Sequence, residues 1–150
     1  MKVLFVCKGN HGRSQIAEAI FNHLSLGKHE AISAGIRVVR EDANKEGQKV
    51  SAVEIIQVMK EMGIDVSAKI RNQVTPEMVE GADKVVVMAQ AETIPDFLKE
   101  NKKVIYWDVP DPAGQSIEFA RGVRDKLKSM ISDFIETSSE LKPNTRINLH

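Results

Sequence analysis

Short runs of branched apolar residues, each followed by a helical pattern, constrain the fold of this chain more than any other sequence feature. The first run, Val3 to Val6, is large and apolar at every position, and similar runs cover residues 84–88 and 104–107. A strand that is apolar at every position is buried on both faces, which is typical of parallel sheets. Strands that alternate with helices predict a doubly wound α/β domain.

Helical periodicity occupies the longer segments between these runs. Apolar residues recur at helical spacing over residues 16–24, 52–63 and about 115–139, and Gly27 and Gly63 are stop signals for the first two segments. Shorter elements complete the alternation: a strand over 31–34 that ends at Gly35, a helix from Thr75 to Ala82 capped by Thr75, and a helix over 94–100. No element is assigned to residues 37–49.

The alternation defines the predicted fold and domain organisation. We predict an α/β fold in which a doubly wound four-stranded parallel sheet, in the order 2-1-3-4, carries helices on both faces. The whole chain, residues 1–150, is predicted to be one domain with a frayed tail at 142–150. Ligands of such sheets bind beyond the carboxyl ends of the strands, so the loops that contain Cys7 and Asp111 are expected to be neighbours.

Charge balance argues against a polyanionic partner. Lysine plus arginine and aspartate plus glutamate each number 21, so the formal net charge is zero and no net field favours nucleic acid or an anionic membrane. A basic group on the last predicted helix is interpreted as a solvated face rather than a polyanion-binding stripe: Arg121, Arg124, Lys126 and Lys128. Nucleic acid and membrane are therefore not expected partners, and the composition sets no oligomeric state.

Cysteine usage favours a reducing, cytoplasmic setting. The chain has one cysteine, Cys7, so an intrachain disulfide cannot form. The N-terminal apolar run is too short for a signal peptide or a membrane span. Four scattered histidines have no metal-ligand spacing, so neither a metal nor a cofactor is predicted.

The loop after the first strand carries the most specific chemical signal. Cys7 ends the strand, and Arg13 follows six residues later, where a helix opens with Ser14. A loop that enters a helix presents unpaired N–H groups and partial positive charge, which suits an oxyanion such as phosphate and favours a thiolate at Cys7. The guanidinium of Arg13 can bind two oxygens of that anion. The loop is therefore predicted to hold both a nucleophile and its anionic substrate.

Each residue of this loop has an expected role. The predicted phosphate-binding residues are Lys8, Gly9, Asn10, His11, Gly12, Arg13 and Ser14. The glycines allow the backbone to approach the anion closely, Asn10 is expected to brace the loop, and Ser14 to cap the helix and donate a hydrogen bond to the thiolate. His11 either adds positive charge or contributes only its backbone N–H, and the second interpretation is favoured. Alternatively, Cys7 is simply a small buried core residue.

The segment Val6 to Ser14 resembles the signature loop of low-molecular-weight protein tyrosine phosphatases and the related arsenate reductases. Further segments follow in the order that the family shows: Ser33-Ala34-Gly35, Met62-Gly63-Ile64-Asp65, Ala82-Asp83, Met88 and Pro110-Asp111-Pro112. The resemblance implies a phosphomonoester hydrolase in which Cys7 attacks phosphorus and forms a phosphocysteine, while Arg13 and the loop amides stabilise the transferred group. Asp111 is the implied general acid, and Asp108 is a rival three residues upstream.

Departures from the phosphatase pattern keep an alternative open. Gly12 replaces a second cysteine, Gln15 replaces a proline, and Ala113-Gly114 replace the aromatic residues that flank a phosphotyrosine, although Tyr106 or Trp107 can approach from the neighbouring strand end. These features resemble the arsenate-reductase branch, whose thioredoxin-coupled members relay oxidation through further cysteines that this chain lacks. A phosphatase of small or varied phosphoesters is predicted. The alternative is a single-cysteine arsenate reductase with an external thiol or a glutaredoxin-like partner. A third interpretation is a phosphate-binding module without turnover, which the retained Asp111 disfavours.

Overall fold

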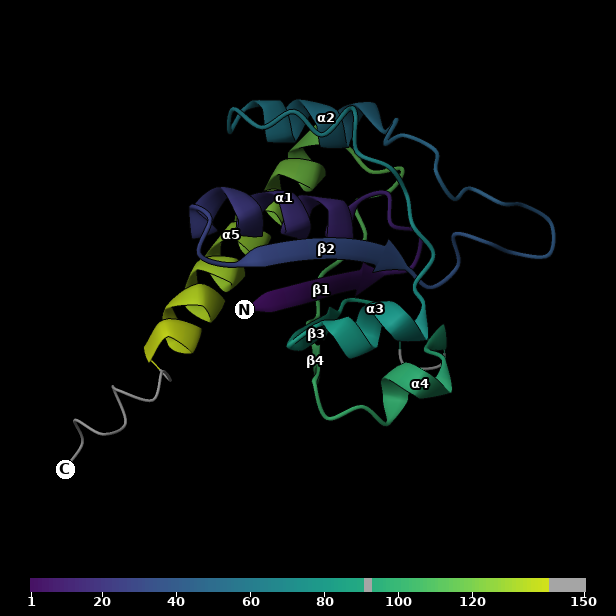
Figure 1. Cartoon of the computed structure of the whole chain (residues 1–150). Coiled ribbons are helices and arrows are strands. Elements are labelled where there is room, and N and C mark those ends of the chain that lie inside the picture. The colour runs from purple at the N-terminus through teal and green to yellow at the C-terminus, as the bar shows by residue number, and fades with distance from the viewer. Residues whose placement is uncertain (91–92, 141–150) are drawn as a thin grey trace.

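Four parallel strands form the centre of the structure (Figure 1). The computed structural model describes residues 1–90 and 93–140. The strands are β1 (Lys2–Cys7), β2 (Glu30–Gly35), β3 (Lys84–Val87) and β4 (Val104–Tyr106), in the spatial order β2-β1-β3-β4. All three pairings are parallel. The predicted sheet and its order are therefore confirmed.

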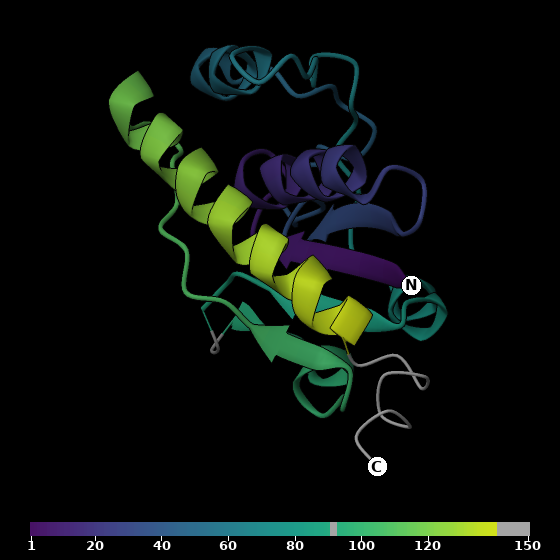
Figure 2. The ribbon, with the colours of Figure 1, turned by 90° about the vertical axis from the view of Figure 1, so that its left-hand side faces the viewer.

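Helices cover both faces of this sheet. They are α1 (Arg13–Ser25), α2 (Val53–Lys60), α3 (Pro76–Gly81), α4 (Asp96–Lys99) and α5 (Ile117–Glu140). Helices α1, α2 and α5 lie on one side of the sheet and α3 and α4 on the other (Figure 1), and α5 runs obliquely across α1 and the sheet (Figure 2). Within the described residues, no helix is both long and apolar enough to cross a bilayer.

Alternation along β1 divides the core into two layers. Val3, Phe5 and Cys7 belong to the apolar cluster beneath α1 and α5, whereas Leu4 and Val6 belong to the cluster beneath α3 and α4. Successive side chains of a strand point to opposite faces, so a run that is apolar at every position fills both layers at once. Cys7 therefore ends the strand with its side chain on the α1 side.

Local signals place most helix ends as predicted, with one correction. The Thr75 side chain accepts a hydrogen bond from Met78 N–H, which confirms it as the cap of α3. The prediction that Ser14 caps α1 is wrong, because the cap position is Gly12 and Ser14 lies inside the first turn. Residues 36–49, which had no predicted element, form a long loop at the carboxyl edge of the sheet (Figure 1). The predicted frayed tail at 142–150 lies outside the described residues.

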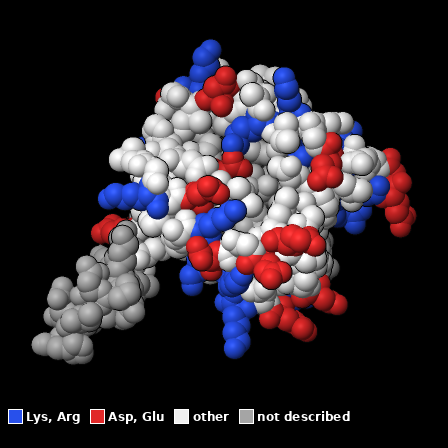
Figure 3. Space-filling view, viewed as in Figure 1, with Lys and Arg blue, Asp and Glu red and all other residues white. Residues whose placement is uncertain are grey.

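Basic residues of α5 connect that helix to the end of α2. Glu61 accepts hydrogen bonds from Arg121 Nη2 at 2.7 Å and from Arg124 Nη1 at 2.6 Å. These two hydrogen bonds lower the pKa of the Glu61 carboxyl to about 2. Arg121 and Arg124 are therefore partly neutralised by an acidic side chain. On the face seen in Figure 3, acidic side chains lie among the basic ones.

Candidate active site

The loop between β1 and α1 has paired carbonyl groups and unpaired N–H groups. Four of its carbonyls accept hydrogen bonds: Lys8 O from Arg37 N–H at 2.8 Å, Gly9 O from Arg71 Nε at 3.1 Å, Asn10 O from Gln15 Nε2 at 3.2 Å, and Gly12 O from Ile16 N–H at 2.9 Å. Among the described residues, no protein group accepts a hydrogen bond from the backbone N–H groups of residues 8–12. Successive free N–H groups beside a helix start are an anion-binding arrangement.

Asn10 holds this loop in shape from the inside. It is fully buried and its backbone is left-handed, with φ 52°, a conformation that asparagine adopts more readily than most residues. Its side-chain Nδ2 donates to Ser14 Oγ at 2.7 Å and to Ser33 Oγ at 3.0 Å. Its Oδ1 accepts from Asn72 N–H at 2.8 Å and from Gln15 Nε2 at 3.2 Å. The bracing that the sequence predicts for Asn10 is therefore present.

The same network orients a hydroxyl toward the cysteine. Ser14 Oγ lies 3.0 Å from Cys7 Sγ. Because that oxygen already accepts from Asn10 Nδ2, its own hydrogen is free to point at the sulfur. Ser33 in turn donates to Glu18 Oε1 at 2.8 Å, and Glu18 forms an ion pair with Lys69. The arrangement suits a Cys7 thiolate, which accepts hydrogen bonds and is the nucleophilic form of cysteine.

Gly35 allows β2 to lie directly behind the loop. A Cβ atom at Gly35 would come within 2.7 Å of the Asn10 backbone nitrogen and of Val38 Cγ2. Such a distance is a steric clash, so the end of β2 accepts only glycine without displacement of the loop. This explains in physical terms why Ser33-Ala34-Gly35 accompanies the loop in the sequence.

Arg13 and Asp111 approach each other from the two loops that the sequence predicts to be neighbours. Arg13 Nη1 donates to Val109 O at 3.2 Å, and Arg13 Nη2 lies 3.7 Å from Asp111 Oδ2. The Arg13 side chain is 12% exposed and that of Asp111 is 53% exposed. Asp111 Oδ1 also accepts from Ala113 N–H at 2.9 Å, which steadies the turn. The rival Asp108 forms no such contact with Arg13 among the described residues.

A cavity of about 370 Å³ opens over this loop and brings the predicted residues together. Its lining includes Cys7, Arg13 and Asp111, together with Ala113 and Gly114. Cys7 is almost fully buried but still lines the cavity, so it is more than a core residue. No aromatic ring follows Pro112 at this cavity, because Ala113 has only a methyl group and Gly114 has no side chain.

A second hollow lies on the other side of Arg13 and Asp111. Tyr106, Trp107 and Asp108 line it, together with Lys8. Trp107 is partly buried and packs against the core, with its ring centroid 6.0 Å from that of Phe5, whereas Tyr106 is 52% exposed. Tyr106 is therefore the aromatic side chain that is free to meet a substrate from this direction.

His11 lies at the edge of the cavity and binds the protein rather than the anion. Its Nε2 accepts from Ser51 N–H at 3.1 Å, which requires an unprotonated nitrogen at that position. Burial and the nearby Arg71 lower the pKa of His11 below its ordinary value, although Glu54 opposes the shift. The interpretation that His11 adds positive charge to the loop is therefore disfavoured, and its backbone N–H remains its predicted contribution.

Two residues of this site were missed by sequence reasoning about function. Gln15 is fully buried, and its Nε2 also donates to Ile70 O at 2.9 Å, so it connects the loop to the segment before α3. Arg71 binds the loop carbonyl of Gly9 and lines the cavity, as do Arg37 and Arg40. The sequence marks Gln15 only as a departure from the phosphatase pattern, where it replaces a proline. No sequence pattern marks Arg71, because it comes from an irregular segment.

A thiol cradled by a strand-to-helix loop, in a parallel sheet of this order, defines a class of cysteine-based α/β enzymes that handle oxyanions. Comparison with protein families then identifies the family within that class. A family model described as low molecular weight phosphotyrosine protein phosphatase matches residues 2–146. The chain belongs to this family.

Individual relatives are named either as arsenate reductases or as protein tyrosine phosphatases. The chain is 34% identical over 134 residues to arsenate reductase 1 of Staphylococcus epidermidis, covering 88% of this chain and 93% of the relative. It is 30% identical over 135 residues to glutaredoxin arsenate reductase of Synechocystis, covering 89% and 95%. The crystal structure of a low molecular weight protein tyrosine phosphatase from T. tengcongensis is 33% identical, with a TM-score of 0.75 and coverage of 91% and 99%. Family membership therefore leaves both phosphatase and arsenate reductase chemistry open.

Proposed function

We propose that this protein is a phosphomonoester hydrolase that works through a phosphocysteine on Cys7. The observation that carries the proposal is the meeting of a sole cysteine, an arginine and a carboxyl group around one cavity. Hydrolysis needs no second thiol, and this chain contains none. The site has every group that two-step phosphoryl transfer to and from water uses.

In the first step, Cys7 Sγ attacks phosphorus and the bond between phosphorus and the ester oxygen breaks. The free N–H groups of the loop and the guanidinium of Arg13 bind the three equatorial oxygens, where negative charge is spread in the transition state. Asp111, in its protonated form, gives its proton to the departing oxygen, because a poor leaving group departs as an alcohol or phenol. Ser14 Oγ lies 3.0 Å from Cys7 Sγ and donates a hydrogen bond to the attacking sulfur.

In the second step, water attacks the phosphorus of the phosphocysteine. Asp111 accepts a proton from that water, the bond between sulfur and phosphorus breaks, and inorganic phosphate leaves. Ser14 then stabilises the thiolate that departs from phosphorus, as it stabilised the nucleophile. Asp111 suits both steps because its loop is exposed at the cavity mouth while the floor of the site is buried.

A second candidate function is supported by the names of the curated relatives. Arsenate resembles phosphate in shape and charge, so the loop and Arg13 would bind it by the same contacts. Reduction then requires an external thiol to attack the sulfur of a cysteine–arsenic adduct, which releases arsenite and leaves a mixed disulfide on Cys7 that a second thiol reduces. A glutaredoxin or a low-molecular-weight thiol would be the partner, since no other cysteine exists in the chain.

One pair of assays separates the two functions. Purified protein is given p-nitrophenyl phosphate without a thiol and, in parallel, arsenate with thioredoxin, with glutaredoxin plus glutathione, or with no thiol. We expect hydrolysis of the phosphoester in the absence of thiols and no arsenite with thioredoxin alone. Thiol-dependent arsenite formation without any phosphoester hydrolysis would make the protein an arsenate reductase instead.

A further inference from the structure

Three arginines line the cavity, and the two-step chemistry uses none of them. Arg37 and Arg40 come from the loop after β2, and Arg71 comes from the segment before α3. We call these three residues the arginine wall. The cavity is lined in total by five basic side chains, the wall together with Lys8 and Arg13, and by two acidic ones, Glu54 and Asp111. A chain with zero net charge therefore concentrates positive charge at this opening.

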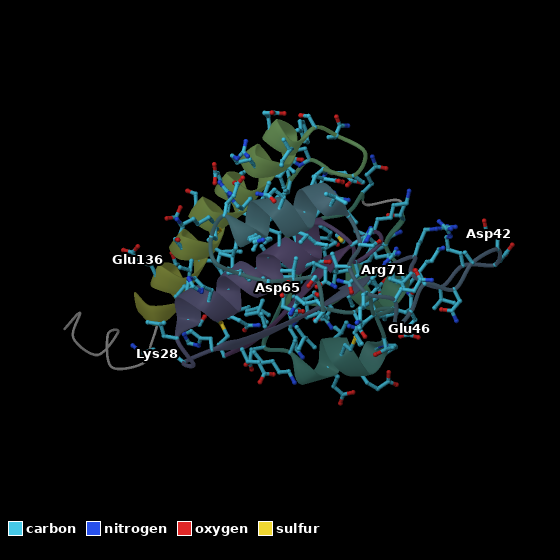
Figure 4. All side chains as sticks on the ribbon, turned by 90° about the horizontal axis from the view of Figure 1, so that it is seen from above. Lys28, Asp42, Glu46, Asp65, Arg71 and Glu136 are labelled. Carbon is cyan, nitrogen blue, oxygen red and sulfur yellow. The ribbon has the colours of Figure 1, made fainter. Side chains whose placement is uncertain are left out.

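Arg71 is the fixed member of the wall. Its Nε donates to Gly9 O at 3.1 Å, and its Nη2 would lie 3.4 Å from a Cβ atom at Gly9, so the guanidinium packs over the loop backbone. In Figure 4, Arg71 lies over the body of the molecule, whereas Asp42 lies at the outer end of the neighbouring loop. Burial lowers the pKa of Arg71 and the charge of Arg40 adds to this shift, whereas the charge of Cys7 opposes it.

The positive charge of the wall is largely uncompensated by the protein. Arg40 Nε lies 3.3 Å from Asp42 Oδ1, an exposed pair. Within residues 1–90 and 93–140, no carboxylate forms an ion pair with the guanidinium of Arg37 or Arg71. Guanidinium groups that crowd together repel one another, and burial adds a cost to Arg71. A bound anion relieves both costs.

The phosphoryl group alone does not account for this wall. In the proposed function its oxygens are bound by Arg13 and by the N–H groups of residues 8–12, which donate to no protein group within the described residues. Arg37 and Arg40 also line a separate hollow of about 880 Å³ that extends toward α4, so they stand at the edge of the site rather than at its floor. An anion bound by the wall would therefore be a different group from the phosphoryl group.

We propose that the arginine wall binds a second anionic group, a carboxylate or a phosphate, carried by the substrate beside its phosphoester. The inference rests on the proposed function because it names the class of phosphoester that the site prefers. The second anion belongs either to a small molecule or to an acidic residue beside a phosphorylated side chain in a peptide. Arginine suits this role because its planar group binds both oxygens of a carboxylate or phosphate.

The test compares non-hydrolysable ligands that differ only in charge. Calorimetry measures the binding of benzylphosphonate, 3-carboxybenzylphosphonate and the uncharged 3-carbamoylbenzylphosphonate to the intact protein. A second arm uses peptides with phosphonomethylphenylalanine flanked by aspartate or by asparagine. We expect the carboxylate ligand of at least one arm to bind about tenfold more tightly than its uncharged match, the strength of a charged hydrogen bond, with the preference weakened by salt.

Variants separate the wall from a general effect of charge. Arg71→Gln and the double variant Arg37→Gln/Arg40→Gln should each reduce the preference for the carboxylate ligand several-fold. Lys126→Gln removes one positive charge from the exposed face of α5 and should leave the preference unchanged. Unlike Arg71→Gln, the double variant breaks no side-chain hydrogen bond to the loop between β1 and α1. A weaker preference in the double variant therefore cannot result from damage near Gly9.

Each outcome decides the inference. A preference in the benzylphosphonate arm assigns the second anion to a small phosphoester, and a preference in the peptide arm alone assigns it to an acidic phosphopeptide. Equal binding of charged and uncharged ligands in both arms, or a preference that stays undiminished in both Arg71→Gln and Arg37→Gln/Arg40→Gln, overturns the inference. Hydrolysis of p-nitrophenyl phosphate is measured in parallel. Hydrolysis without a charge preference contradicts the second anion site and supports the proposed function. A charge preference without hydrolysis supports the anion site and contradicts the proposed function.

Discussion

The cavity has a floor, which is the loop between β1 and α1, and a rim, where Asp111 and the arginine wall lie. The two are built in opposite ways. On the floor, Asn10 and Gln15 are fully buried, and their hydrogen bonds fix the loop before any ligand arrives. On the rim, Asp111 and Arg40 are exposed, and each pairs with a charged neighbour at more than 3.2 Å. Exposed pairs of this kind contribute little to stability, so rim side chains move at small cost.

This difference separates the task that all substrates share from the tasks that distinguish them. Binding a phosphoryl group demands the same geometry in every turnover, so a preorganised floor suits it. Leaving groups differ in size and charge, and the proton donor must reach the ester oxygen of each, so a rim of exposed side chains suits them. Substitutions on the floor should therefore affect all substrates alike, while those on the rim should depend on the leaving group.

The largest effect is expected from the floor. Cys7→Ser should lower kcat by more than about 10⁴-fold for every substrate, because a serine hydroxyl is not ionised at neutral pH as a thiol can be. Phosphate binding should be retained, since Arg13 and the loop N–H groups are unchanged. Steady-state kinetics with calorimetry of phosphate binding measures both. Substantial residual hydrolysis would remove Cys7 from the mechanism.

The rim should respond according to the leaving group. Asp111→Asn should slow hydrolysis of phosphoesters with poor leaving groups by about 10²- to 10⁴-fold, the usual contribution of a general acid. p-Nitrophenyl phosphate, whose leaving group needs little protonation, should be affected far less. Asp108→Asn is the matched control from the same loop. If Asp108→Asn shows the leaving-group dependence and Asp111→Asn does not, the general acid has been assigned to the wrong carboxyl group.

Stability should distinguish floor from rim as clearly as activity does. Asn10→Ala removes the hydrogen bonds that Asn10 donates to Ser14 and Ser33 and leaves the Asn72 N–H group without its acceptor, and it should lower the free energy of unfolding by about 2–3 kcal/mol. Asp111→Asn, in an exposed side chain, should change it by less than about 0.5 kcal/mol. Urea denaturation of both variants gives the comparison. Equal losses would contradict the view that only the floor is preorganised.

The smallest expected effect on activity comes from a cluster away from the cavity. The folded-state pKa of Glu61 is about 2, below its ordinary value of 4.5, because of hydrogen bonds from Arg121 and Arg124. Its stabilisation is therefore fully present above pH 4.5 and is lost as the pH falls toward 2. Glu61→Gln should lower Tm at neutral pH, with a difference from wild type that shrinks over this acidic range, and should leave kcat/KM unchanged. A Tm difference that is independent of pH would exclude the ion pair as its cause.

The sequence predicts the residues that carry the chemistry of the site better than the residues that hold its loop in place. Val3 to Val6 specify a strand buried on both faces, and the adjacent loop carries Cys7 and Arg13 within six residues, so both are local signals. The partners of Asn10 are not local: Ser33 is 23 residues away and Asn72 is 62 residues away. Arg71 joins the site only because residues 70–74 lie beside β2, and such irregular pairing has no periodic pattern to reveal it.

Ser14 shows how a correct residue can be given a partly wrong role. A serine at a helix start usually caps it, which is why the sequence predicts a cap. Here the helix begins one residue earlier, and the hydroxyl is used instead between Asn10 and Cys7. The prediction of a hydrogen bond to the sulfur was right because the loop length brings both side chains to the same place.

A phosphoryl group on Cys7 can be trapped during turnover. Protein mixed with p-nitrophenyl phosphate is quenched in acid within the first turnovers, and its peptides are examined by mass spectrometry. We expect a phosphoryl group on Cys7 that is absent from Cys7→Ala protein and that accumulates more in Asp111→Asn, because Asp111 activates the water of the second step. Release of p-nitrophenol with no phosphoryl group on Cys7, or with the group on another residue, would contradict the account.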